Sequence, residues 1–350
     1  MMSRLQELKD VLENISSAWE RHEKAAMVMQ IGVKGSAYRL PGAKMMMATD
    51  GRMFGTISGG CLESDLYGWA EKAMETNTCV THKYDLSENE IWGLGIGCKG
   101  KLDIFILPIE PYDEFWMMTN QIIQKGQKIT MILDVSSGKG LIVDKHGNLI
   151  GNPGSVPFEV VEKARKVMDT QTRAELMNLE GKRYLIDAIK PSEHLIIAGA
   201  GRDAVPVVEL AAKAGFSVTV LDSRKDFNND RLFPLACNLQ KCPDEIDPSE
   251  YTGSWWVVMN HIQSLDEKTL QVALKSDPRY IGVLGPISRT TEMLNTIGED
   301  FNSGPIHSPI GLDIGAETMD EVALSIVSEL MSVRNGRIPA PLHGKVKIHA

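Results

Sequence analysis

The sequence predicts an α/β protein in which a mixed, β-rich N-terminal part precedes a doubly wound parallel sheet. Three observations predict this class: an apolar helical face at the start of the chain, short apolar runs around glycine turns in the first third, and regular alternation of apolar runs with helical patterns after residue 191. Such alternation is typical of parallel sheets, whose strands are buried on both faces.

The length of the chain predicts more than one domain. Its 350 residues exceed what one hydrophobic core usually supports, and 43% hydrophobic with 24% charged residues is the composition of a folded protein. We predict an N-terminal domain over residues 1–111, a connecting α/β segment over 112–190 and a nucleotide-binding domain over 191–340.

Charge and composition exclude several classes of function. A formal net charge of −9 opposes binding to phosphate backbones, so we expect no nucleic-acid partner. No stretch approaches the roughly 18 apolar residues of a membrane span, so we expect no membrane partner and a cytoplasmic location. The five cysteines contain no Cys-x-x-Cys pair, which argues against a disulfide framework or a zinc ribbon.

The first part reads as a helix followed by a β-rich module. Apolar residues at the start share one helical face: Leu5, Leu8, Val11, Leu12 and Ile15. Apolar runs, together with the Asp50-Gly51 turn, predict strands within 25–35, 44–60, 80–86 and 101–110, and helical spacing predicts a helix over 61–77. In the connecting segment the same signals predict helices over 113–125 and 157–170, with strands over 128–135 and 140–144.

A glycine-rich turn gives the sharpest signal in the second part. The apolar run 195–198 leads into Gly199-Ala200-Gly201-Arg202-Asp203-Ala204, which fits G-x-G-x-x-A. The first glycine allows the tight turn, the second lets a pyrophosphate approach the backbone, and Ala204 is small enough for helix–strand packing. A predicted helix and a strand over 217–221 lead to Asp222, where an acid would hold a ribose hydroxyl.

This context predicts a Rossmann-type nucleotide-binding fold. The candidate ligand contacts are Gly199, Gly201, Ala204 and Asp222. A nucleotide, NAD(P), another ligand and an unused cleft all remain open from these residues alone.

Two cysteines of the first part are crowded by glycines. Cys61 follows Gly59-Gly60 at a predicted helix N-terminus, where free amides favour a thiolate, and Cys98 precedes Lys99 between further glycines. Soft thiolates suit soft metals and sulfur transfer, although a free cysteine is also often a small buried apolar residue.

A third glycine-bearing stretch, residues 35–44, carries Arg39 and Lys44. Its amides and cations predict a cradle for a phosphate or a pterin-like anion, with a solvated loop as the alternative.

Together these segments resemble the XdhC/CoxI family of xanthine dehydrogenase accessory proteins. The resemblance is carried, in order, by GSAYRLPGAKM, DGRMFGTISGGCLESD, GLGIGCKG, GAGRDAV, VTVLDSR, YIGVLG and SPIGLDIGAETMDEVALSI. The chain departs from the family's usual pattern at Lys99, at Arg202 and at Pro286-Ile287-Ser288-Arg289.

The resemblance implies a maturation factor that need not turn over a substrate. Such a protein would bind molybdenum cofactor (molybdopterin), hold it during sulfuration by a cysteine desulfurase, and deliver it to a xanthine dehydrogenase-type apoenzyme. It would be a homodimer, with Cys61 and Cys98 at the metal or sulfur of the cofactor, Cys61 as the metal contact, and Gly199, Gly201 and Asp222 at a nucleotide moiety.

Two other functions compete with this one. The glycine turn would also suit an NAD(P)-dependent oxidoreductase acting on a small molecule, whose hydride transfer would not need Cys61. A nucleotide-sensing scaffold that docks on a dehydrogenase is the third. The iron–sulfur subunit of a xanthine dehydrogenase is excluded, because its two clusters need more thiolates than five cysteines supply.

Overall fold

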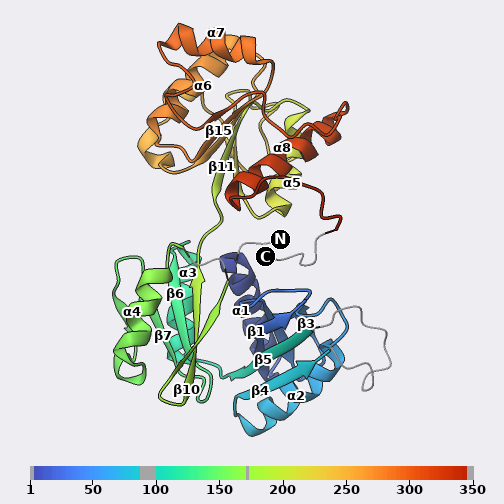
Figure 1. Ribbon diagram of the computed structural model, residues 1–350, viewed down its shortest axis with the longest axis vertical. Coiled ribbons are helices and arrows are strands. Elements are labelled where there is room, and N and C mark those ends of the chain that lie inside the picture. The colour runs from blue at the N-terminus through green and yellow to red at the C-terminus, as the bar shows by residue number, and fades with distance from the viewer. Residues whose placement is uncertain (1–3, 87–99, 171–172, 345–350) are drawn as a thin grey trace. The chain divides into compact units, whose positions relative to one another are not determined.

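The computed structural model describes residues 4–86, 100–170 and 173–344, and the chain divides into two units at residue 191 (Figure 1). We call Ser3–Pro191 the N-terminal unit and Ser192–Pro341 the Rossmann unit.

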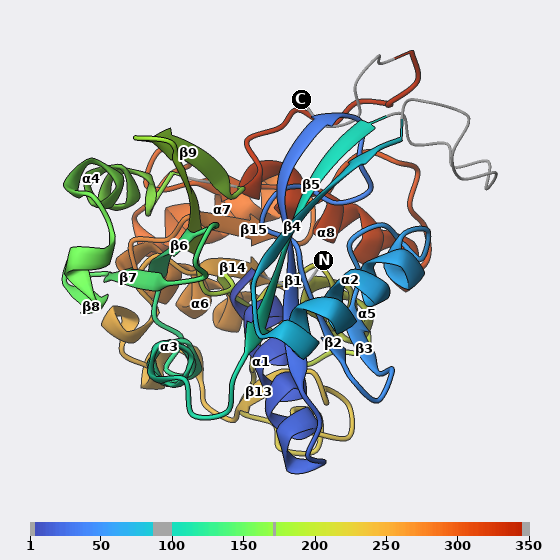
Figure 2. The ribbon, with the colours of Figure 1, turned by 90° about the horizontal axis from the view of Figure 1, so that it is seen from below.

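The first sheet of the N-terminal unit is antiparallel, in the order β3-β2-β1-β5-β4. Alternate residues of its strands face opposite ways, so Met27 and Met29 pack towards α1 whereas Ala26 and Val28 pack towards α2. Figure 2 shows these two helices flanking the sheet. The elements are α1 (Arg4–Glu20), β1 (Ala25–Gly35), β2 (Lys44–Ala48), β3 (Met53–Gly55), α2 (Glu63–Thr76), β4 (Val80–Asp85) and β5 (Gly100–Ile109).

The second sheet of this unit is also antiparallel, in the order β8-β7-β6-β10-β9. Helix α4 covers one face, while α3 and α1 meet the other face in the core that the first sheet also joins. The elements are α3 (Glu114–Gln124), β6 (Ile129–Asp134), β7 (Gly140–Asp144), β8 (Leu149–Gly151), the 3₁₀ turn Pro153–Ser155, α4 (Phe158–Val167), β9 (Glu175–Leu179) and β10 (Lys182–Ile189).

The Rossmann unit is built on six parallel strands in the order β13-β12-β11-β14-β15-β16. Helices α5 and α8 cover one face and α6 and α7 the other, as Figure 1 shows. Its elements are β11 (His194–Ala198), α5 (Ala204–Lys213), β12 (Ser217–Leu221), β13 (Ala236–Leu239), 3₁₀ turns at Pro243–Glu245 and Pro248–Tyr251, β14 (Trp255–Val258), α6 (Gln263–Lys275), β15 (Tyr280–Val283), α7 (Ile287–Ile297), β16 (Ile306–His307) and α8 (Met319–Arg334).

The order of the strands reverses between β11 and β14, which are neighbours although most of the unit's first half lies between them in the chain. At such a switch point the loops at the carboxyl ends of the strands part, and ligands of open α/β sheets bind there. The glycine turn 199–203 and residues 259–262 form the two sides of this point.

The predicted fold class is confirmed: antiparallel sheets with helices precede a parallel, doubly wound sheet. The division at residue 111 stays a prediction; the two antiparallel sheets share one core through α1. No helix within the described ranges is both long and apolar enough to cross a membrane.

Candidate functional site

Cys61 lies exposed on the loop that leads into α2. Two glycines with positive φ precede it, and at Gly60, where φ is 106°, a Cβ would meet nothing within 4 Å. The backbone conformation there is one that L-residues rarely adopt, so glycine is required for the shape of the turn rather than for lack of room. The result is a thiol beside open space, which a ligand can approach.

The loop that carries Cys61 is organised by the carboxylate of Glu63. Oε1 accepts hydrogen bonds from the Thr56 hydroxyl at 2.7 Å and from the backbone N–H groups of Ile57 at 3.1 Å and Ser58 at 2.9 Å. Oε2 accepts from the Ser58 hydroxyl and from the N–H of Gly60 at 2.9 Å and Leu62 at 3.2 Å.

These bonds set the charge of the loop. Partial burial would raise the pKa of Glu63, but the hydrogen bonds from Ser58, Thr56 and Ile57 outweigh it and lower the pKa to about 2. The N–H groups of Gly60 and Leu62, which were expected to favour a thiolate at Cys61, therefore already donate to the ionised carboxylate of Glu63. The sequence analysis did not identify this role of Glu63. The signal for it in the sequence is an acid two residues after Cys61, preceded by the hydroxyl-bearing residues Thr56 and Ser58.

Cys98 and the glycines on either side of it lie outside the described residues. Its contact with a cofactor stays a prediction.

Arg39 and Lys44 make their contacts inside the N-terminal unit. Arg39 donates to Glu7 at 2.7 Å and to the Thr56 carbonyl at 3.2 Å. The Lys44 side chain is fully buried and donates to Asp187 at 2.5 Å and to the Gly42 carbonyl at 2.9 Å. Burial lowers the pKa of Lys44 to about 7, with the charge of Arg4 as the next cause.

An anion cradle made by Arg39 and Lys44 would require these pairs to open. Their predicted contact with a phosphate or pterin stays a prediction.

The glycine turn of the Rossmann unit makes close contacts within the protein, and its predicted contact with a pyrophosphate stays a prediction. Gly199 has φ of 115°, and a Cβ there would come within 2.4 Å of the Met259 carbonyl oxygen on the loop after β14. A Cβ on Gly201 would come within 2.3 Å of Asp203 Oδ1. Ala204 is fully buried between α5 and the sheet.

Asp222 is brought to the turn but its oxygens are occupied. It accepts from Ala200 N at 2.9 Å, from Arg224 N at 2.9 Å and from the Arg224 guanidinium at 2.6 and 3.0 Å. Burial would raise the pKa of Asp222, but the Arg224 and Ala200 hydrogen bonds outweigh it and lower the pKa below its ordinary value. Its predicted bond to a ribose would have to compete with these donors.

His261 spans the switch point. Its Nε2 lies 2.7 Å from Asp203 Oδ2, and its backbone has φ of 60°, which is uncommon for a residue with a side chain. The contact joins the loop after β14 to the start of α5.

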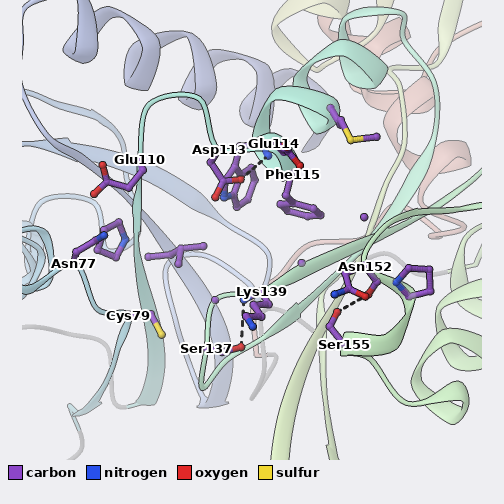
Figure 3. A pocket seen from close by; sticks show the side chains of 18 residues that line it. Asn77, Cys79, Glu110, Asp113, Glu114, Phe115, Ser137, Lys139, Asn152 and Ser155 are labelled. Atoms are coloured by element: carbon purple, nitrogen blue, oxygen red, sulfur yellow. Dashed lines mark hydrogen bonds between the residues drawn. The ribbon is translucent and has the colours of Figure 1, made fainter.

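The N-terminal unit also contains a groove of about 860 Å³, drawn in Figure 3. Glu110 and Asp113 lie on one side of it and Ser137 and Lys139 on the other. Cys79 lines it as well, donating its thiol to the Ser136 carbonyl at 3.3 Å, and burial raises the pKa of this thiol.

This groove is separate from the Cys61 loop. It adjoins Asn77, at the far end of the 14-residue helix α2, and a helix of that length spans roughly 20 Å. Within the described ranges, no three His, Cys, Asp or Glu side chains are placed to hold a metal ion together.

Comparison with known proteins places the chain in a family. Two family models match it: the XdhC and CoxI family over residues 18–85, and the XdhC Rossmann domain over residues 195–330. A Bacillus subtilis protein, named as a probable subunit of xanthine dehydrogenase, is 31% identical over 321 residues, which cover 90% of this chain and 94% of the relative.

Two further proteins are similar over most of the chain. The molybdenum cofactor insertion chaperone PaoD of Escherichia coli is 24% identical over 315 residues, covering 89% of this chain and 83% of the relative. A crystal structure from Bacillus halodurans, described as a xanthine dehydrogenase, matches with a TM-score of 0.77 and 27% identity, covering 97% of this chain and 99% of that one. The glycine-flanked Cys61 loop, the Rossmann turn and these matches together show that the chain belongs to the XdhC and CoxI family.

Proposed function

We propose that this protein binds molybdenum cofactor and delivers it to a xanthine dehydrogenase-type apoenzyme. The observation that carries the proposal is the exposed Cys61 thiol, which follows two glycines on a loop whose backbone is hydrogen-bonded to Glu63. The relative PaoD, named as a molybdenum cofactor insertion chaperone, supports a role in the maturation of a molybdoenzyme.

The residues at the loop fit such cargo in part. Cys61 offers a soft sulfur ligand next to unoccupied space at Gly60, which suits the molybdenum of the cofactor. Glu63 cannot serve as a second ligand without giving up the bonds that shape the loop. We propose that Cys61 is the protein's contact to the metal, that Cys98 assists it, and that Glu63 positions the loop.

The remaining partners are part of the same proposal. A cysteine desulfurase would sulfurate the cofactor while it is held, and the protein would work as a homodimer in the cytoplasm. The predicted contact of a nucleotide moiety with Gly199, Gly201, Ala204 and Asp222 is not part of this proposal, because the oxygens of Asp222 are already bonded to Ala200 and Arg224.

The test is retention of cofactor after gel filtration. The protein is incubated with molybdenum cofactor released from a molybdoenzyme, and molybdenum and pterin in the protein fraction are measured for wild type, Cys61→Ala and Cys237→Ala. Cys237 is an exposed cysteine of the Rossmann unit and serves as the matched control. We expect loss of both signals for Cys61→Ala alone.

Two results would overturn the proposal. Wild type that retains neither molybdenum nor pterin is not a carrier. Equal retention by Cys61→Ala and wild type would remove Cys61 from the site. A second readout is activation of a xanthine dehydrogenase apoenzyme, which loaded wild type should support and Cys61→Ala should not.

An NAD(P)-dependent oxidoreductase is the second candidate, favoured by the close approach of the chain at Gly199 and Gly201. It predicts saturable binding of NADH or NADPH and hydride transfer that Cys61→Ala leaves unchanged. Against it stands the engagement of Asp222 by Arg224, because the acid that would hold the ribose is already bonded.

A further inference from the structure

A cavity of about 770 Å³ lies beside the glycine turn of the Rossmann unit. Three segments line it: the turn with the start of α5, the loop 226–232 after β12, and the start of α8. Its volume is in the range of pockets that hold a ligand the size of a nucleotide. No residue of the loop after β14 lines it, so it lies to one side of the switch point, on the flank of α5 and α8.

Two arginines at the cavity are available to a ligand. The side chains of Arg202 and Arg231 are exposed and line it, and neither guanidinium has a hydrogen-bond or ion-pair partner among the residues that the structure describes. Arg224, by contrast, is held by Asp222 and lies over the Phe227 ring at 4.7 Å. Guanidinium groups bind phosphate oxygens in a fixed, often bidentate geometry, so a pair of free arginines at one cavity favours a phosphate group.

The other walls of the cavity are apolar or acidic. Phe227 and Met319 line it although 46% and 56% of their surfaces are exposed, and Val205, Pro206 and Leu232 complete an apolar surface that a flat ring can cover. Asp226 and Asp320 also line it, and no partner of either carboxylate is found in the described part of the chain. Carboxylates accept hydrogen bonds from the exocyclic amino groups of heterocycles.

The crevice of the switch point itself is poorly arranged for a dinucleotide. Asp222, the expected ribose ligand, is occupied by Ala200 and Arg224. The His261 contact to Asp203 joins the two sides of the crevice and places a carboxylate beside Gly201, where a pyrophosphate would approach the backbone.

We propose that the cavity on the α5–α8 flank, and not the crevice at the switch point, is the ligand site of the Rossmann unit, and that it binds a phosphate monoester of an amino-substituted heterocycle. Arg202 and Arg231 hold the phosphate, the ring lies against Phe227 and Met319, and Asp226 or Asp320 accepts from the amino group. This inference concerns a different unit from Cys61. Its nucleotide-binding test does not rest on the proposed function, whereas the test by retention of molybdenum cofactor does.

The first experiment measures binding by isothermal titration calorimetry at low salt. The probes are guanosine, cytidine and adenosine 5′-monophosphates, each with its unphosphorylated nucleoside, and NADH. We expect at least one nucleotide to bind about tenfold or more tightly than its nucleoside, because charge-assisted hydrogen bonds to phosphate are lost without it. NADH should bind more weakly than that nucleotide.

The variants are Arg202→Gln, Arg231→Gln and the matched control Arg279→Gln. Arg279 is exposed in the same unit but lies just before β15, at the opposite, amino edge of the parallel sheet. Either cavity variant should weaken the nucleotide by roughly tenfold to a hundredfold and leave the nucleoside unchanged. Arg279→Gln should change neither. All three arginines are exposed, so unfolding temperatures should match that of wild type.

The phosphate ester bound in the cell could belong to a nucleotide or to the phosphate of a pterin cofactor. Retention of molybdenum cofactor by the same variants separates the two sources: loss in both cavity variants assigns the cavity to the cofactor's phosphate, and unchanged retention with weakened nucleotide binding assigns it to a nucleotide. The proposal fails if no nucleotide binds and cofactor retention is unaffected. It also fails if Arg279→Gln weakens nucleotide binding as much as the cavity variants do. A third contrary result is that NADH binds more tightly than every nucleotide and that neither cavity variant changes its affinity.

Discussion

Asp187→Asn removes a fully buried carboxylate that contacts Lys44 and Arg4. Asp187 and Lys44 are both fully buried with Nζ and Oδ2 2.5 Å apart, and the Arg4 guanidinium contacts the other oxygen. Below about pH 7, where Lys44 carries its charge, breaking a buried ion pair on one side leaves an uncompensated charge and costs about 3–5 kcal/mol. Because single domains unfold with about 5–15 kcal/mol, this change should remove a large share of the stability of the N-terminal unit.

The assay must report on the N-terminal unit alone, since tryptophans occur in both units. Hydrogen exchange of the β2 and β10 amides, followed by mass spectrometry at increasing urea, gives the free energy of unfolding locally. The matched control is Asp169→Asn, whose partner Lys128 lies at the same 2.5 Å but whose side chain is 71% exposed. Exposed pairs contribute about 0–1 kcal/mol, so this control should change little.

The reasoning is refuted if Asp187→Asn lowers the free energy of unfolding by less than about 1 kcal/mol, or by no more than Asp169→Asn does. Burial of the ion pair would then add nothing to its contribution to stability. The expected thermal counterpart is a fall of roughly 6–20 °C in the unfolding temperature of the N-terminal unit.

Three further predictions follow from the charges and close contacts. Burial lowers the pKa of Lys44 from 10.5 to about 7, so between about pH 7 and pH 10.5 the unfolded chain binds more protons than the folded one. The free energy of unfolding should therefore rise with pH in this range. Urea titrations should show this rise for wild type and not for Lys44→Met. The carboxylate of Glu63, with its pKa lowered from 4.5 to about 2, contributes stability above pH 4.5 that is lost as pH falls to about 2; Glu63→Gln should flatten acid titrations in this window, and an unchanged profile would contradict it. Gly199→Ala should lower the stability of the Rossmann unit by about 2–4 kcal/mol, because the new Cβ would lie 2.4 Å from the Met259 carbonyl oxygen. The control Gly298→Ala is at a position that also has a positive φ but open space around it, and should cost about 1–2 kcal/mol. Equal losses of stability in thermal unfolding would contradict the close contact at Gly199.

The Rossmann unit could be predicted from the sequence because its signals are local. The run 195–198, the glycines at 199 and 201 and the strand up to Leu221 each report a buried strand or a tight turn within a few residues. The sequence also placed Asp222 at the turn. It could not show that Arg224 would occupy this acid, because that depends on rotamers and not on spacing.

In the N-terminal unit the strands of the first sheet could be predicted from the sequence, whereas the second sheet could be predicted only in part. The strand β10 was missed because Asp187 interrupts its apolar pattern, and only the structure shows that Lys44, far away in the chain, neutralises this residue. Lys44 was predicted as an anion ligand for the same reason: its partner Asp187 lies far away in the sequence, so the pair could not be recognised there. Non-local pairing leaves no periodic signal in the sequence.

The shared core of the N-terminal unit has a consequence for how the chain is made. Residues of α1 and β1 are buried in one core with residues of β6 and β10, so this core is not complete until the chain up to Ile189 has left the ribosome. Translation at about 5–20 residues per second separates β5 from the end of β10 by roughly 4–16 s. During that time α1 can cover part of the methionine-bearing face of β1 and β2, and the part of the face that β6 and β10 later bury stays exposed to water.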